Sequence, residues 1–168
     1  MPTFTTDKTT KFCIRFAEEK DVPTLLAMIR ELAAYEKLLD KVEVTQQVLL
    51  DSIFRRRAVE ALVAEQEGRP AGYALFFTNF SSFVGKAGIF VEDIYVKPEH
   101  RKNGLGKQLF AYIAAVAVER GYSRIDWTCL DWNKPSMAFY EKLGAKPLGE
   151  WITFRLSGED LKKLAARA

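Results

Sequence analysis

The amino-acid sequence predicts an α/β fold with a mixed, mostly antiparallel central sheet and helices on both faces. In the first half, the apolar segments 58–65 and 71–78 flank the short turn Gly68-Arg69-Pro70, a pattern typical of an antiparallel hairpin. From residue 87 onward, strand and helix patterns alternate, which is typical of strand–helix–strand units. With 168 residues and 48% hydrophobic content, the chain can form one domain with a sizeable core.

The elements before the hairpin are a strand and two helices. Phe12–Phe16 alternates as a first strand. Asp21 is expected to cap a helix that ends near Tyr35-Glu36, because the apolar residues after Asp21 share one helical face. A second helix is predicted from Thr45 to about Arg55.

The elements after the hairpin alternate. Gly121 and Gly144 each follow a helical pattern and are expected C-caps. Ser157-x-x-Asp160 predicts a capping box at a short terminal helix. The expected elements are strand 87–96, helix 105–120, strand 124–130, helix 135–143, strand 148–156 and helix 159–166.

Domain organisation is expected to be simple. No internal repeat and no low-complexity linker divides the chain. Residues 1–11 are rich in Thr and Lys and are expected to form a flexible tail. Residues 12–168 are then expected to form a single domain.

Composition narrows the classes of function. The net charge is +3, but 25 basic and 22 acidic residues are interleaved, and Arg55-Arg56-Arg57 is the only dense basic run, so nucleic-acid binding is not expected. Cys13, Cys129 and the single histidine, His100, cannot form a metal-ligand cluster. Without a signal peptide or a long apolar run, we expect a cytoplasmic protein with no membrane span and no disulfide.

The most informative segment is Arg101-Lys102-Asn103-Gly104-Leu105-Gly106, between an apolar strand and an amphipathic helix. It fits Arg/Gln-x-x-Gly-x-Gly/Ala, and its two glycines allow positive φ angles that turn backbone N–H groups inward. The helix N-terminus adds roughly half a positive charge, so the segment suits a phosphate group. It lacks the Lys-Ser/Thr of a P-loop and the first glycine of a dinucleotide fingerprint. By itself, such a glycine pair can also be only a tight turn.

A second motif follows about thirty residues later. Asn133-x-x-Ser136-x-x-x-Tyr140-x-x-x-Gly144, together with the glycine segment, resembles the GNAT superfamily of acetyl-CoA-dependent N-acetyltransferases. Within that superfamily, Val91–Val96, Glu31–Glu36 and Leu130–Asn133 are similar to the spermidine/spermine and thialysine acetyltransferases. The resemblance covers roughly residues 12 to 156.

The resemblance implies the GNAT fold, with a splayed cleft in which the pantetheine arm of acetyl-CoA pairs with the central strand at Ile94 and Val96. The backbone of the glycine segment would bind the pyrophosphate, and Asn133 and Ser136 would hold the pantetheine or adenosine side. The implied cofactor-binding residues are Ile94, Tyr95, Val96, Arg101, Lys102, Asn103, Gly104, Leu105, Gly106, Lys107, Asn133, Ser136, Phe139, Tyr140 and Lys142.

Acetyl transfer to an amine needs a base and an acid. An alkyl ammonium with a pKa near 10.4 costs about 4 kcal/mol to deprotonate near neutral pH. Glu92 and Asp93 are adjacent in a strand, so alternation sends them to opposite faces unless a bulge intervenes. The resemblance points to Glu92 as the base, direct or through a water, although either acid could instead pair with Lys86 or Arg101.

Tyr140 is implied as the general acid that protonates the coenzyme A sulfur. A tyrosine beside Phe139 on a helix can also be ordinary core packing. By the same resemblance, Tyr35 and Glu36 bind the acceptor together with Glu92 and Asp93. Because Asp40 is the main remaining carboxylate in the corresponding loops, we expect a short cationic amine, such as a diamine or a thialysine- or lysine-like amino acid, with spermidine kept open.

Partners and alternatives complete the prediction. A homodimer is expected from the resemblance and from the aromatic residues Trp151 and Phe154. The alternative functions are a peptide or protein N-acetyltransferase and a non-catalytic coenzyme A-binding regulatory module. Bulky Tyr35, Phe80 and Phe83 suggest a closed pocket rather than an open peptide groove.

Overall fold

A computed structural model describes residues 11–168, so nearly all of the predicted tail, 1–11, lies outside the described residues. The chain forms two compact units, one up to Thr128 and one from Cys129 to Ala168. Their relative position is not determined, and each unit is described by itself. The single domain expected over 12–168 stays a prediction.

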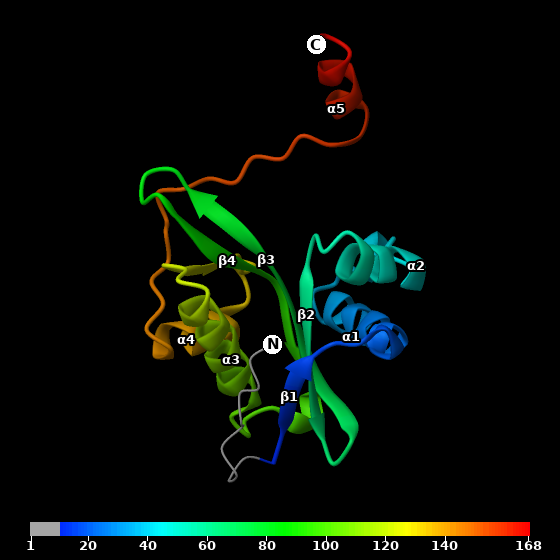
Figure 1. Cartoon of the computed structure of the whole chain (residues 1–168), viewed down its shortest axis with the longest axis vertical. Coiled ribbons are helices and arrows are strands. Elements are labelled where there is room, and N and C mark those ends of the chain that lie inside the picture. Colours follow the sequence, from blue (N-terminus) through cyan, green and yellow to red (C-terminus); the bar gives the residue numbers. More distant parts are fainter. Residues whose placement is uncertain (1–10) are drawn as a thin grey trace. The chain divides into compact units, whose positions relative to one another are not determined.

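The first unit contains a five-stranded sheet in the order β1-β2-β3-β4-β5 (Figure 1). Neighbouring strands are antiparallel except for β4 and β5, which are parallel. The predicted mixed, mostly antiparallel sheet is therefore confirmed. The strands are β1 Cys13–Phe16, β2 Glu60–Gln66, β3 Arg69–Ser81, β4 Lys86–Val96 and β5 Ile125–Trp127.

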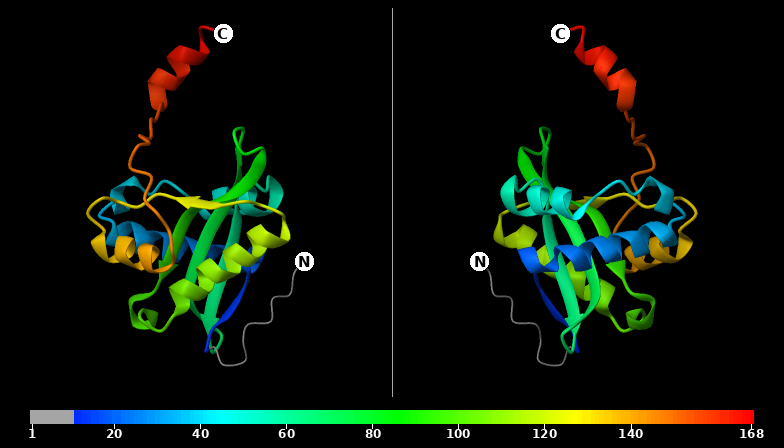
Figure 2. Two further views of the ribbon diagram at one scale, coloured as in Figure 1. Left: turned by 90° about the vertical axis from the view of Figure 1, so that its left-hand side faces the viewer. Right: turned by 90° about the vertical axis from the view of Figure 1, so that its right-hand side faces the viewer.

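Helices cover both faces of this sheet. α1 (Val22–Tyr35) and α2 (Gln46–Leu50) lie on one face, and α3 (Leu105–Glu119) lies on the other (Figures 1 and 2). The predicted helix 45–55 is thus split, because α2 continues as the π-helical turn η3, Asp51–Arg55. The remaining short turns of this unit are the 3₁₀ segments η1 Glu19–Asp21, η2 Leu39–Lys41 and η4 Pro98–His100.

Two apolar layers fix these helices. On the α1 face, Leu25 and Met28 are buried in one cluster with Tyr73, Leu75 and Tyr95 of the sheet. Each fully buried side chain of this size contributes roughly 1.5–3 kcal/mol. On the other face, buried side chains of α3 pack against the sheet. The helix contributes Leu109, Tyr112 and Ile113, and the sheet contributes Phe16 and Phe76.

The start of α1 corrects one prediction. Asp21 makes no side-chain cap to α1. Its carboxylate instead accepts the Glu18 N–H at 2.8 Å, closing the 3₁₀ turn η1, and pairs with Arg15 at 2.6 Å. A buried carboxylate needs a charged partner, and Arg15 lowers the pKa of Asp21.

A β-bulge interrupts β4. Leu75 pairs with Asp93, but the next residue of β3, Phe76, pairs with Val91, which leaves Glu92 as the extra residue. Paired residues share a face, so Asp93 lies with Leu75 on the α1 face, whereas Val91 lies with Phe76 on the α3 face. The alternation of side chains between the two faces therefore breaks at Glu92. This is the bulge that the sequence analysis named as the exception to placing Glu92 and Asp93 on opposite faces.

The second unit contains α4 (Lys134–Lys142) and α5 (Gly158–Ala165). The strand predicted over 148–156 is wrong for the described chain: residues 145–157 are neither helix nor strand. Their apolar side chains are exposed, with Trp151 at 71% and Phe154 at 89%. A strand needs a hydrogen-bonded neighbour, and none pairs with this segment among the described residues.

Two smaller predictions, about the bounds of a strand and the cap of a helix, also fail. The strand predicted over 124–130 is limited to Ile125–Trp127. Ser157 makes no side-chain cap to α5, whose first turn carries instead a 2.7 Å ion pair between Glu159 and Lys162. Both differences concern the ends of elements, which sequence patterns locate less well than the elements themselves.

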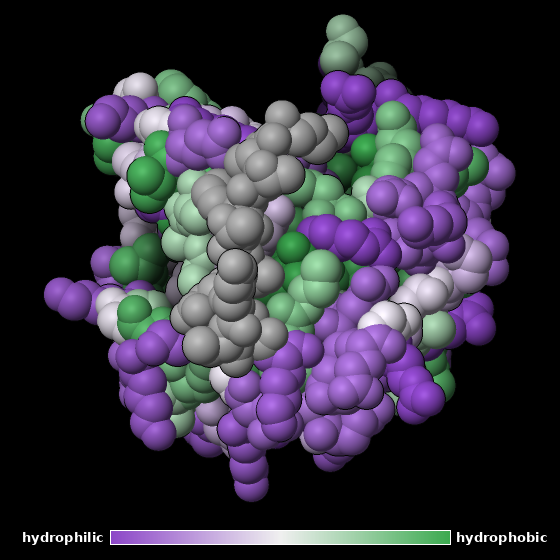
Figure 3. Space-filling view, turned by 60° about the horizontal axis from the view of Figure 1, so that its bottom comes forward, coloured by the Kyte–Doolittle hydropathy of each residue, from purple (hydrophilic) through white to green (hydrophobic). Residues whose placement is uncertain are grey.

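The face of the molecule shown in Figure 3 is mostly hydrophilic. On the face shown in Figure 3, hydrophilic side chains surround smaller hydrophobic areas, in keeping with the 25 basic and 22 acidic residues of the chain. Of the helices that the structure describes, none is long and apolar enough to cross a membrane.

Candidate functional site

The parallel pairing of β4 with β5 ends early. β5 pairs only with Ile89, Phe90 and Val91 of β4, and no described strand continues along that side from Glu92 to Val96. The Lys97 N–H donates to the Ala71 carbonyl at 2.9 Å, on the β3 side. Because an antiparallel ladder alternates, the N–H and C=O groups of Ile94 and Val96 turn toward the open side. An extended ligand with amide groups can pair there as an added strand.

The glycine segment leads from this open edge into α3. Lys102 and Gly104 have positive φ angles of 63° and 83°, and Gly104 is the N-cap of α3. Gly106 was expected to share this geometry. It is instead the second residue of α3 and is not among the described positive-φ glycines.

The N-terminus of α3 offers unpaired backbone donors. The first helical hydrogen bond runs from the Gln108 N–H to the Gly104 carbonyl at 3.1 Å. The N–H groups of Leu105–Lys107 therefore have no partner within the helix. A side chain built at Gly104 would meet only Gln108 Nε2, at 3.9 Å, so the space beside these donors is open. This geometry suits a phosphate group, as the sequence predicts.

Arg101, at the start of the segment, turns back toward the sheet. Its Nε donates to the Val96 carbonyl at 2.9 Å. Its guanidinium carbon lies 5.1 Å from the centre of the Tyr35 ring and 5.8 Å from that of Tyr95, within cation–π range. The exposed side chains of Lys102, Asn103 and Lys107 lie farther along the segment and the helix.

Acidic groups gather where α1 ends beside β3 and β4. Tyr73 Oη donates to Asp93 Oδ2 at 3.0 Å. Burial raises the pKa of Asp93 to about 6, and the negative charges of Glu92 and Glu36 add to the effect. Burial also raises the pKa of Glu36, the residue after α1. Negative charges that raise the pKa of a neighbouring carboxylate favour a cation near that carboxylate.

The two candidate bases differ in exposure. Glu92 is exposed at the bulge, at the point where β5 ends, whereas Asp93 is partly buried on the α1 face. Neither acid forms an ion pair with Lys86 or Arg101 among the described residues. The interpretation of these acids as ordinary surface charge pairs is therefore not supported.

Glu31 and Tyr73 are site residues that sequence reasoning missed. Glu31 accepts a hydrogen bond from Tyr95 Oη at 3.1 Å and pairs with Lys97 at 2.7 Å. Burial and Glu31 raise the pKa of Tyr95 to about 12. Glu31 precedes Tyr35 by four residues and so shares its helical face, a signal that the sequence contains. No such signal marks Tyr73, because its role depends on strand register.

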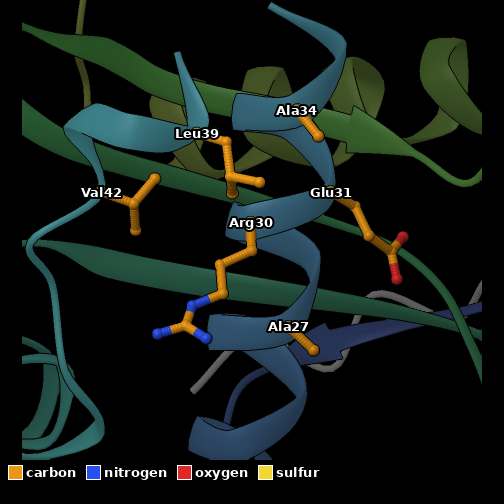
Figure 4. Close-up of a pocket in the computed structure, with 6 residues that line it drawn as sticks. All are labelled: Ala27, Arg30, Glu31, Ala34, Leu39 and Val42. Carbon is orange, nitrogen blue, oxygen red and sulfur yellow. The ribbon is translucent and has the colours of Figure 1, made fainter. Parts of the chain in front are cut away.

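A shallow pocket of about 490 Å³ lies beside α1 and shares Glu31 with the site described above. In Figure 4 the Glu31 side chain points away from Leu39 and Val42, which close the other side. None of the predicted site residues lines it. The lining residues are Ala27, Arg30, Glu31, Ala34, Leu39 and Val42.

In the second unit, α4 carries the other predicted residues. Asn133 is buried, and its side-chain carbonyl accepts the Ser136 N–H at 3.4 Å, which makes Asn133 the N-cap of α4. The rings of Phe139 and Tyr140 lie 5.5 Å apart and are partly buried. Lys142, in the last turn, is exposed. The structure thus assigns Asn133 a local role in starting the helix that carries Tyr140.

Two further predictions concern a pocket and metals. Phe80 and Phe83, near the tip of the β3–β4 hairpin, are 67% and 95% exposed, so the described chain does not form the closed pocket expected from them. Within the described residues, no group of three or more His, Cys, Asp or Glu side chains is arranged to hold a metal ion.

Comparison with known proteins agrees with this arrangement. The family model of the acetyltransferase (GNAT) family matches residues 25–145. The chain is 39% identical to a thialysine N-epsilon-acetyltransferase of Bos taurus, over 92% of this chain and 97% of the relative. It is 28% identical to an L-ornithine N5-acetyltransferase of Arabidopsis thaliana, over 90% of this chain and 86% of the relative.

Solved structures show the same fold. An integron cassette protein of V. cholerae superposes with a TM-score of 0.77 at 24% identity, over 93% of this chain and 98% of that chain. The open edge of β4 and the glycine segment indicate the same family as the sequence relatives do. The chain therefore belongs to the GNAT family of acetyltransferases and is an acetyl-transferring enzyme that acts on amine substrates.

Proposed function

We propose that this enzyme is an acetyl-CoA-dependent N-acetyltransferase that acts on a primary amine of a small cationic metabolite. The candidate acceptors are a diamine, a polyamine, or a thialysine- or lysine-like amino acid. Transfer is direct, within a ternary complex. The observation that carries this proposal is the open edge of β4, which runs into the Gly104 segment and lies beside the acids at the end of α1.

Two sets of backbone groups would hold the cofactor. Ile94 and Val96 present amide groups along an open strand edge, which fits the amides of a pantetheine arm. The N–H groups at the start of α3 fit a pyrophosphate, and each charge-assisted hydrogen bond contributes roughly 1.5–3 kcal/mol. Bound acetyl-CoA supplies an acetyl group activated as a thioester. The other proposed contacts are Tyr95, Arg101, Lys102, Asn103, Lys107, Asn133, Ser136, Phe139, Tyr140 and Lys142.

The substrate nitrogen loses two protons on the way from ammonium to amide, and the leaving thiolate gains one. Glu92, directly or through a water, takes a proton from the substrate ammonium, and the amine nitrogen then forms a bond to the acetyl carbonyl carbon. The carbon–sulfur bond breaks, and Tyr140 donates its phenol proton to the leaving thiolate. The nitrogen loses its second proton as the amide forms, and this proton returns, directly or through a water, to the Tyr140 phenolate. The position of Glu92 at the bulge, where β5 ends, supports this role because the backbone there is open to an added ligand.

The acceptor amine is proposed from charge. Burial raises the pKa of both Asp93 and Glu36, and the charge of Glu36 raises that of Asp93 further, so a cation near them would lower the cost of keeping both ionised. Two carboxylates suit a short molecule with one reacting amine and one further ammonium group. The named activities of the relatives, on thialysine and on ornithine, support an amino acid of this kind.

A peptide N-acetyltransferase is the second candidate. Phe80 and Phe83 are exposed and do not close a pocket, so these residues leave room for an extended peptide acceptor. A non-catalytic coenzyme A-binding module is not favoured, because the family and the named relatives are acetyltransferases.

We also propose a homodimer. Trp151, Ile152 and Phe154 are at least 71% exposed in the single chain, and apolar surface of this extent on a short segment is typical of an interaction site. A second copy is the partner that the resemblance to dimeric enzymes favours.

Release of the coenzyme A thiol, measured at fixed acetyl-CoA over a panel of amines, tests the proposed function. The panel contains thialysine, lysine, ornithine, putrescine, spermidine and a short peptide with a free N-terminus. We expect the highest kcat/KM for one of the small amines. If the peptide gives the highest kcat/KM, the enzyme is a peptide N-acetyltransferase instead. If no amine releases the coenzyme A thiol, both proposed functions are rejected.

A further inference from the structure

We propose that the buried hydroxyl of Tyr73 is a positioning group for the acceptor amine: it holds one oxygen of Asp93 and leaves the other oxygen, as part of an anion, to bind the substrate ammonium. Tyr73 does not touch the substrate and acts only through Asp93. This inference rests on the proposed function, which places Asp93 in the acceptor site, and it adds the group that keeps this carboxylate ionised.

The first observation is the strand register that brings the two side chains together. Tyr73 pairs with Tyr95 and Leu75 pairs with Asp93, so Tyr73 and Asp93 are diagonal neighbours on the α1 face of β3 and β4. Tyr73 Oη donates to Asp93 Oδ2 at 3.0 Å. Both partners lie on paired strands, so neither side chain depends on a loop for its position.

The second observation is that Tyr73 can act only as a donor. Its side chain is fully buried, and burial together with the charge of Asp93 raises the pKa of the phenol well above its ordinary value. The phenol therefore keeps its proton throughout the neutral range. The ring of Tyr95 lies 6.1 Å away and its hydroxyl donates to Glu31, so it does not compete for Asp93. A buried hydroxyl without access to water keeps the one acceptor that it has.

The third observation is that Asp93 has one donor and no cationic partner among the described residues. Oδ1 of this carboxylate accepts no hydrogen bond from them. Burial raises the pKa of Asp93 to about 6, and Glu92 in β4 and Glu36 after α1 add to this effect with their negative charges. The hydrogen bond from Tyr73 opposes all three influences and lowers the pKa. The hydroxyl is thus the group of the chain that favours the anionic form of Asp93.

The hydroxyl then sets the lowest pH at which the acceptor site carries this charge. A hydrogen bond to the charged form of a carboxyl group favours that form, and one of ordinary strength changes a pKa by about one pH unit. Without the hydroxyl, Asp93 would be half protonated near about pH 7 instead of about pH 6. A protonated carboxyl group has no charge to attract an ammonium group, so a cationic amine would bind weakly to it.

Steady-state kinetics with thialysine at saturating acetyl-CoA tests this role. Tyr73→Phe keeps the ring and removes only the hydroxyl. We expect its KM for thialysine to be about fivefold above the wild-type value at pH 6 and equal to it at pH 8.5, where Asp93 is ionised in both proteins. The two kcat values should agree at each pH, because bound ammonium keeps Asp93 ionised. Tyr112→Phe is the matched control: it removes the hydroxyl of a buried tyrosine of α3 and should leave KM unchanged at both pH values.

A second measurement needs no amine. Carboxyl ¹³C signals of protein labelled at aspartate report the titration of Asp93, whose signal is identified by its loss in Asp93→Asn. Its midpoint should rise from about pH 6 to about pH 7 in Tyr73→Phe. An unchanged midpoint in the folded variant, or a ratio of KM values that is the same at pH 6 and pH 8.5, would overturn the proposal. A wild-type enzyme that does not acetylate thialysine would instead reject the proposed amine, and a raised midpoint would still support the role of Tyr73.

Discussion

Tyr73 Oη donates a 3.0 Å hydrogen bond to Asp93 Oδ2, between neighbouring strands and on the face covered by α1. Tyr73 is fully buried, and burial together with Asp93 raises the pKa of its phenol well above the ordinary value. The same burial raises the pKa of Asp93 to about 6. The fold therefore holds an acid in a place where ionisation costs free energy, as functional sites often do.

Asp93→Asn is expected to stabilise the fold in a pH-dependent way. An aspartate has a pKa near 3.8 when unfolded and about 6 here, so the folded state binds more protons between these values. Its contribution to stability is complete below about pH 3.8 and is lost as pH rises through about 6. Asparagine keeps an acceptor for Tyr73 without a charge. Urea unfolding should show an advantage of the variant that grows by roughly 2 kcal/mol between about pH 4.5 and 8.

Asp131→Asn is the control for this measurement, because Asp131 is an exposed carboxylate. Its stability relative to the wild type should stay flat over the same pH range. An Asp93→Asn advantage that did not change with pH would show that Asp93 carries no raised pKa in the folded protein.

Local patterns predicted most of the first unit. The central strand was expected at 87–96 and is Lys86–Val96, and the helix expected at 105–120 is Leu105–Glu119. Both elements have a clear apolar periodicity. The segment between them contains two glycines, Gly104 and Gly106, which are typical of a loop that leads into a helix. The apolar periodicity that distinguishes such a strand from such a helix repeats over a few residues, so the sequence displays it directly.

Contacts set by register could not be predicted. The bulge at Glu92 results from how β3 and β4 pair, and it decides that Asp93 lies with Tyr73 on the α1 face. The contact of Arg101 with Tyr35 joins residues far apart in sequence. The predicted strand 148–156 failed for a related reason, since alternation shows only that one side of a segment is apolar and not what pairs with it.

Glu92→Gln is expected to change the pH dependence of the reaction. If Glu92 takes the proton from the ammonium, its loss leaves deprotonation to solvent, so the rate should recover as pH rises toward the pKa of the amine, near 10.4 for a lysine-like group. The measurement is kcat/KM against pH for both enzymes. An unshifted profile in Glu92→Gln, with a shifted one in Asp93→Asn, would give the role of base to Asp93.

Tyr140→Phe is expected to lower kcat by about 10²–10⁴ and to leave the affinity for acetyl-CoA nearly unchanged, because phenylalanine keeps the ring and removes only the proton donor. Single-turnover rates and calorimetry separate these effects. Phe139→Leu is the comparison, since it disturbs the neighbouring ring, 5.5 Å away, without removing a hydroxyl. Wild-type kcat in Tyr140→Phe would mean that another group or water protonates the sulfur.

Gly104→Val is expected to weaken binding of coenzyme A at least tenfold. Gly104 has a φ of 83° and open space beside the first N–H groups of α3, where a side chain would stand between these donors and a phosphate. Gly68→Val is the matched control: Gly68 has a φ of 74°, similar open space and a place in the β2–β3 turn. Both variants carry similar backbone strain, so calorimetry should show lost affinity only at Gly104. Equal affinity in both folded variants would contradict the assignment.

The exposed segment of the second unit predicts a dimer that depends on its aromatic residues. Trp151 and Phe154 are 71% and 89% exposed, and aromatic side chains of this size can each bury about 150–250 Å². Sedimentation equilibrium at micromolar concentration should give twice the 19.1 kDa mass of the chain. Trp151→Ser with Phe154→Ser should shift the protein to a single chain, whereas Phe83→Ser, at a residue 95% exposed near the hairpin tip, should leave the dimer intact. Circular dichroism checks that each variant is folded. A wild-type mass of one chain would reject the dimer, and a double variant that stays dimeric would place the interface away from this segment.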